Sequence, residues 1–187
     1  MPKILEYGKI VIKETTDTFG DYPWSFINMA DQMAVMLFDL IKRLMPDRIV
    51  IEETTKGRNR WSQKNLEQLH CCLLLRLQKH SMDIGHPKVY YVSPSIWRKK
   101  LEMRLTKEDQ ENNKIARKAN KMSKAEKKKL KTAAGVKGII NKKHLAIRWV
   151  EKHYGIVFKM VDDDIADVIC LGIGFMRGAK TDNGTGF

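Results

Sequence analysis

Apolar residues recur at helical spacing in four parts of the chain. Between residues 28 and 44 they repeat every three or four positions, and Pro46 follows as a stop, so we predict an amphipathic helix there. The same spacing predicts a helix after Ser62, its candidate cap, with Leu66, Leu69, Leu73 and Leu77 facing the core. Two more helices are predicted over residues 141–154 and 164–176.

Shorter runs have the character of strands. Residues 5–13 alternate and are rich in β-branched side chains, which predicts an edge strand, and residues 156–160 predict a short one. Residues 48–52 are an apolar run of the kind found in strands buried on both faces of a parallel sheet, and residues 89–92 predict another strand. Strand, helix and strand of these lengths predict a parallel βαβ unit, and so an α/β fold, with a mixed sheet if the first strand runs antiparallel.

Positive charge changes this picture, because it is strongly localised. The chain has 187 residues, a net charge of +13 and a pI near 9.7. Residues 98–143 hold 17 Lys and Arg against 5 Asp and Glu, which is nearly the whole excess. Ser123 followed by Glu126 is a capping-box pattern, so this basic segment is expected to be helical. A nucleic acid is the expected partner, with a membrane surface as the weaker alternative.

Length and hydropathy favour a single domain over residues 1–177, with a loose polar tail over residues 178–187. The sequence contains no apolar run of the roughly 20 residues that span a bilayer. We therefore expect a soluble, cytoplasmic protein.

Acidic residues stand where apolar neighbours would bury them. Glu52 closes the strand 48–52, at the end where open α/β sheets place their sites, although it could equally begin a solvated loop. Asp164 and Asp167 lie one helical turn apart and share a face; the plainer interpretation is that such acids favour the helix dipole. Asp167 sits in an apolar stretch, where a buried charge needs a metal ion or another partner.

Together Glu52, Asp164 and Asp167 are three hard oxygen ligands suited to Mg²⁺ or Mn²⁺. Beside a basic segment, that set fits phosphodiester hydrolysis assisted by two metal ions.

Three motifs occur in an order that resembles a known family. They are Val-Ile-Glu-Glu (50–53) at a strand end, Val-Ser-Pro-Ser-Ile-Trp-Arg (92–98) after the next strand, and Tyr154-Gly155 followed by Asp-Asp-Ile-Ala-Asp (163–167). This arrangement, over about residues 5–176, resembles the RuvC-like Holliday junction resolvases, especially the phage-type members.

The resemblance implies a ribonuclease H-like mixed sheet flanked by helices, with a basic helical insertion before the last helices. It also implies a homodimer, Mg²⁺ or Mn²⁺ held by Glu52, Asp164 and Asp167, and paired nicks in four-way DNA junctions. Trp61, in the loop after the acidic strand, would stack on a base at the exchange point, or else belong to the core. The residues expected to contact DNA are Lys56, Arg58, Arg60, Trp61, Arg98, Lys99, Lys100, Arg117, Lys118 and Lys137.

The chain departs from the family at its first strand. The resemblance begins at the family's third strand, with residues 5–10, and the first catalytic Asp of the family has no match. We therefore expect weak or no cleavage with junction binding retained. Two alternatives stay open: a DNA-binding protein without catalysis, and another ribonuclease H-like nuclease acting on a different DNA shape.

Overall fold

The computed structural model describes residues 2–12, 21–53, 60–136 and 138–178, with the side chains of residues 60–62 left out. Within these ranges the chain divides into two compact units. The first unit comprises residues 5–96, and the second comprises residues 97–178 with residues 2–4. The single domain over residues 1–177 stays a prediction. The predicted tail lies outside the described residues, apart from Gly178.

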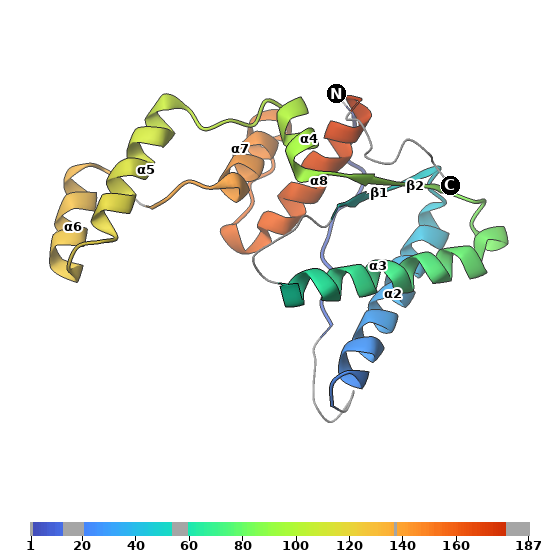
Figure 1. Ribbon diagram of the computed structural model, residues 1–187. Coiled ribbons are helices and arrows are strands. Elements are labelled where there is room, and N and C mark those ends of the chain that lie inside the picture. Colours follow the sequence, from blue (N-terminus) through green and yellow to red (C-terminus); the bar gives the residue numbers. More distant parts are fainter. Residues whose placement is uncertain (1, 13–20, 54–59, 137, 179–187) are drawn as a thin grey trace. The chain divides into compact units, whose positions relative to one another are not determined.

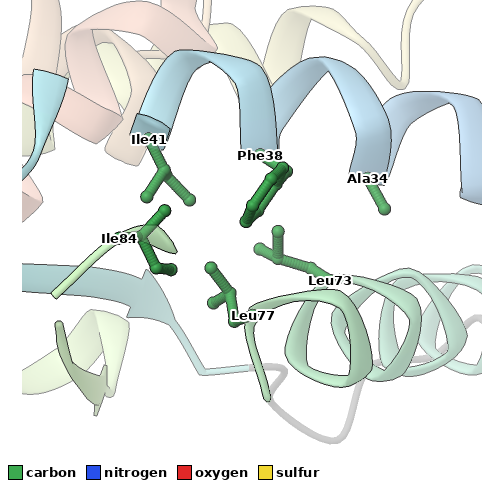
Figure 2. Packing of buried hydrophobic residues seen from close by; sticks show 6 residues of the cluster. All are labelled: Ala34, Phe38, Ile41, Leu73, Leu77 and Ile84. Atoms are coloured by element: carbon green, nitrogen blue, oxygen red, sulfur yellow. The ribbon is translucent and has the colours of Figure 1, made fainter. Parts of the chain in front are cut away.

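Two helices supply the core of the first unit. Helix α2 (Trp24–Leu44) ends where Met45 adopts a left-handed backbone, just before Pro46, as the sequence predicts. Its residues Ala34, Phe38 and Ile41 pack against Leu73 and Leu77 of helix α3 (Arg60–Lys79) (Figure 2). Ile84, just after the 3₁₀ turn η1 (Ser81–Asp83), completes this cluster.

The sheet of this unit is the predicted parallel pair. Strand β1 (Arg48–Glu52) pairs in parallel with β2 (Lys88–Val92), and Glu52 lies opposite Val92. The Glu53 N–H continues the ladder by donating to the Val92 carbonyl at 3.0 Å. Helix α3 connects the two strands, which confirms the βαβ unit. The strands are mostly half-buried, so the prediction that both faces are buried is wrong.

Two other predicted strands are absent from the described residues. Residues 5–12 and 156–159 are extended or irregular, and Met160 belongs to the 3₁₀ turn η2 (Met160–Asp162). The sheet over the described ranges therefore has two parallel strands and is not the mixed sheet that we expected. The reason is physical: an alternating segment becomes a strand only where a neighbouring strand takes up its backbone hydrogen bonds.

The start of α3 also differs from expectation. Ser62 lies inside the first turn of the helix, so it is not the cap. Leu66 leaves 48% of its surface exposed, whereas Leu73 and Leu77 are buried as predicted. The apolar stripe of this helix therefore begins later than its leucine spacing suggests.

Helices build the second unit (Figure 1). Helix α4 (Pro94–Lys100) runs into it from the first unit, and α5 (Lys107–Ala119) and α6 (Lys124–Ala133) form a helical hairpin. Helix α7 (Lys142–Tyr154) packs along α8 (Asp163–Met176). The predicted helices at residues 141–154 and 164–176 are confirmed, and so is the expected helical character of the basic segment.

Local signals explain where these helices begin and end. The Asn141 side chain caps α7 by accepting from the Lys143 and His144 N–H groups at 3.0 and 3.3 Å. Gly155 ends that helix with φ of 69°, a conformation that favours glycine. The Ser123 N–H donates to Glu126 Oε2 at 3.2 Å at the start of α6, where the capping-box pattern predicted a helix start. No helix in the described ranges is long and apolar enough to cross a membrane.

Candidate functional site

The first turns of α8 carry the acidic cluster that the sequence singled out. Asp163 opens the helix and is buried, whereas the Asp164 side chain is 66% exposed. Asp167 follows one turn after Asp163, with only 16% of its side chain exposed. Asp163 and Asp167, four residues apart, are therefore the two inward-facing carboxylates.

Arg98, at the end of α4, contacts the second of these two acids, Asp167. Its Nη2 donates to Asp167 Oδ2 at 3.3 Å, and its own side chain is 16% exposed. The guanidinium also lies over the Trp97 ring, 4.4 Å from the ring centroid, a cation–π geometry. Arg98 is thus the protein partner that buried Asp167 requires.

One oxygen of the same carboxylate is left unsatisfied. Asp167 Oδ1 is buried and has no hydrogen-bond partner among the described residues, and the same holds for Arg98 Nε. Buried polar atoms without a partner are rare in folded proteins, because leaving them unpaired costs about 1–3 kcal/mol. This oxygen can therefore still bind a cation or accept a hydrogen bond.

A second cation reaches the cluster from the first turn of α7. Lys143 Nζ forms an ion pair with Asp163 and approaches Asp164 Oδ1 at 3.5 Å. Hydrogen bonding to Asp163 is the main reason that the pKa of Lys143 is raised. The three carboxylates of α8 therefore face two positive side chains of the same unit.

The electrostatics of Asp167 reflect its burial. Burial raises the pKa of this carboxyl, and the charge of Asp163 adds to the effect, while Arg98 and Lys143 lower it. The net direction is upward, which means that the two cations do not fully compensate the ionised carboxylate. A bound divalent cation would lower this pKa again.

Glu52 is half-buried at the carboxyl end of β1, in the first unit, whereas Asp164 and Asp167 belong to the second. No group of three His, Cys, Asp or Glu residues among the described residues is placed to hold a metal ion. The convergence of Glu52 with the two aspartates stays a prediction.

The residues predicted to contact DNA fall into three groups. Arg98 faces inward and pairs with Asp167, as described above. Lys99, Lys100, Arg117 and Lys118 are exposed at the ends of α4 and α5. The rest are known only in part: Lys56, Arg58 and Lys137 lie outside the described residues, and so do the side chains of Arg60 and Trp61.

The backbone nevertheless corrects one of these assignments. Trp61 stands in the first turn of α3 and not in a loop, because the helix begins at Arg60. Its proposed stacking role stays a prediction.

Sequence reasoning missed two members of the α8 cluster. The sequence predicts a helix start at Asp164, which leaves Asp163 outside the helix. In the structure α8 begins at Asp163, so Asp163 and Asp167 share one face of the helix. Lys143 was counted only as part of the basic segment. Its place after the capping residue Asn141 was the available signal, since it sets the side chain in the first turn of α7.

No protein-family model matches the chain, and no curated protein or solved structure matches it significantly.

Proposed function

We propose that this chain is a RuvC-like, structure-selective endonuclease that acts on four-way junctions by metal-dependent phosphodiester hydrolysis, with a ribonuclease H-like fold. The order of elements supports the proposal: a parallel βαβ unit has Glu52 at a strand end, helix α4 follows the second strand, and α8 carries the aspartates. The charge supports it as well, since residues 98–143 carry most of the positive excess.

The observation that carries the proposal is the state of Asp167. Its carboxylate is largely buried, its pKa is raised by burial despite Arg98, and no described residue forms a hydrogen bond with its Oδ1. In a purely structural ion pair, the carboxylate would be expected to have both oxygens satisfied and a pKa that is not raised. Perturbed carboxylates of this kind are common at functional sites.

The donor set fits Mg²⁺ or Mn²⁺, which prefer carboxylate oxygens. Asp167 and Asp164 would hold the ion, with Glu52 as the third ligand. When bound, such ions activate water and stabilise the leaving oxygen in phosphodiester hydrolysis. Arg98 and Lys143 would hold the acids in place before an ion arrives. They would also offset part of the negative charge of the acids beside an approaching phosphate.

The exposed lysines and arginines at the ends of α4 and α5 are proposed to contact the phosphate backbone of the junction arms. A homodimer would place two such sets on one junction, in keeping with its symmetry.

A second candidate function is DNA binding without catalysis. The ion pairs favour it, because Asp163 and Asp167 already have Lys143 and Arg98 as partners. In that case the acids would serve to join α4, α7 and α8.

The double variant Asp164→Asn/Asp167→Asn separates these two functions. Wild-type protein is expected to bind a synthetic four-way junction more tightly than linear duplex of equal length, to bind Mn²⁺, and to nick the junction weakly. The double variant should lose Mn²⁺ binding and any nicking but keep its junction affinity within about twofold, because no phosphate-binding cation is removed. Titration with Mn²⁺ and gel-shift assays measure both properties.

Asp39→Asn is the matched control, since Asp39 is an exposed aspartate of α2 far along the chain from the acidic cluster. It should leave metal binding unchanged. Mn²⁺ binding that survives in the double variant, or is absent from wild type, would leave DNA binding without catalysis as the function. Equal affinity for junction and duplex would contradict junction selectivity.

A further inference from the structure

Helix α6 contributes no residue to a hydrophobic core. None of its residues is buried, although it is ten residues long. Helix α5 is its main contact (Figure 1). Its one large apolar residue, Leu130, is only half-buried, so the helix gains little from packing and its lysine-rich composition calls for another explanation.

Lysines dominate this helix and gather on one face. Lys124, Lys127, Lys128 and Lys131 follow each other at intervals of three, one and three residues, which places all four on the same side. Leu130 lies beside the shared face, next to Lys127 and Lys131, and the fifth lysine, Lys129, stands on nearly the opposite side. Like charges at this spacing repel each other, so the bare helix is less stable than its length suggests.

No ion pair within the described residues neutralises these lysines. The single acid of the helix, Glu126, accepts hydrogen bonds at the helix start from the Ser123 N–H at 3.2 Å and from the Ser123 hydroxyl at 2.6 Å. By contrast, α5 pairs Lys114 with Glu111 at 2.6 Å. Lys124, Lys128 and Lys129 are exposed, whereas Lys127 and Lys131 are half-buried, so most of the positive charge of α6 is presented to solvent.

The base of the α5–α6 hairpin is fixed to the rest of the second unit. The buried Asn113 side chain donates to the Ile140 carbonyl at 2.8 Å and accepts from the Ile140 N–H at 2.7 Å. Buried Asp109 accepts from Arg148 of α7 at 2.9 and 3.0 Å. A charged helix held in this way differs from a loose basic tail, because its lysines keep a defined spacing.

We propose that the lysine face of α6 is a second DNA contact that binds the phosphate backbone of a duplex arm, separate from the residues near the acidic cluster. This inference rests on the proposed function. From Lys124 to Lys131 the helix rises about 10 Å, the axial length of about three nucleotides in one strand of B-DNA. The face reads no base sequence, and it binds linear duplex and junction arms alike.

The triple variant Lys124→Gln/Lys128→Gln/Lys131→Gln tests this role. Gln keeps a helix propensity close to that of Lys, so α6 should still form, which circular dichroism can check. Lys42→Gln/Lys79→Gln/Lys88→Gln removes the same charge from exposed sites of the first unit and serves as the control. The measurement is DNA affinity between about 50 and 200 mM salt, by fluorescence anisotropy, with the four-way junction and with linear duplex.

Each phosphate contact contributes about −0.9 to the slope of log K against log salt. Loss of three contacts should make the slope shallower by about 2.7, so wild-type affinity should fall roughly 40-fold more than that of the α6 variant over this range. The loss should be equal for junction and duplex, with the junction preference and Mn²⁺ binding unchanged, and the control should behave as wild type.

An unchanged slope in the α6 variant would overturn this inference while the proposed function stands. An equal change in the control would also overturn it, because only total charge would then matter. Tighter α6-dependent binding of duplex RNA than of duplex DNA would assign the face to another partner. Failure of wild type to bind either DNA would overturn the inference and the proposed function together.

Discussion

Asp109 shows what a well-satisfied buried carboxylate looks like in this protein, in contrast to Asp167. It accepts both hydrogen bonds from Arg148 Nη1, and its Oδ2 accepts from the Thr106 N–H at 3.1 Å. The Thr106 hydroxyl in turn accepts from the Asp109 N–H at 3.0 Å, which completes a capping box at the start of α5. The hydrogen bond from Arg148 is the main reason that the pKa of Asp109 is lowered.

The lowered pKa of Asp109 makes the free energy of unfolding depend on pH in the acid range. A lowered pKa in the folded state means that ionised Asp109 stabilises the fold above its unfolded pKa of about 3.9, and that this stabilisation is lost as the pH falls through the folded value. Asp109→Asn should therefore lower the free energy of unfolding by about 1–2 kcal/mol near pH 7, discounted because Arg148 is half exposed. The deficit should shrink as the pH falls below about 4.

Urea unfolding at several pH values measures this effect. Glu108→Gln, at the exposed neighbouring position in the same helix turn, should change the stability by only a few tenths of a kcal/mol. A deficit for Asp109→Asn that is the same at every pH would show that the charge of Asp109 has no part in it.

The acidic cluster shows how far residues can be predicted from sequence. The importance of Asp167 was predictable, because an acid within the apolar run Ile165 to Leu171 needs a partner. The identity of that partner was not, since Arg98 lies 69 residues away and only the fold brings the two together. The packing of α8 likewise decides that Asp163, and not Asp164, faces inward.

At the scale of elements, the packing of α8 against α4 depends on one glycine. A Cβ atom added at Gly174 would lie 2.8 Å from Trp97 Cβ and 3.3 Å from the Trp97 backbone. Trp97 is fully buried, so it has little freedom to move away. Gly172, two residues earlier in the same helix, has no such neighbour within 4 Å.

Gly174→Ala should therefore destabilise the protein by about 1–3 kcal/mol, even though alanine is the better helix former. Gly172→Ala should stabilise it by up to about 1 kcal/mol for the same helix-forming reason. Thermal unfolding of both variants gives the comparison. A Gly174→Ala variant as stable as Gly172→Ala would mean that α4 and α8 do not approach this closely.

Helices were more predictable than strands in this chain, for a physical reason. The helices over residues 28–44, 141–154 and 164–176 have their hydrogen bonds within the segment, and Pro46, Asn141 and Gly155 mark their ends locally. The βαβ pair was predictable because its two strands are close in sequence. Residues 5–12 and 156–159 also have the composition of strands, but they lack a strand to pair with in the described part of the chain.

At the scale of the whole molecule, the proposed metal site combines acidic residues from both units. The first unit ends β1 with Glu52, and the second opens α8 with Asp163, Asp164 and Asp167. Sequence alone could place each acid on its element. The proposed metal site would need these acids to come together, which no local pattern encodes.

Iron-directed backbone cleavage tests this meeting most directly. Fe²⁺ takes the place of Mg²⁺ at carboxylate sites, and with ascorbate and peroxide it generates radicals that cut the polypeptide close to the ion. The account predicts cuts near Glu52 and near residues 163–167 in the same sample, both suppressed by Mg²⁺ and both lost in Asp167→Asn. Cuts at only one of these segments, or cuts that persist in Asp167→Asn, would contradict a metal centre built from both.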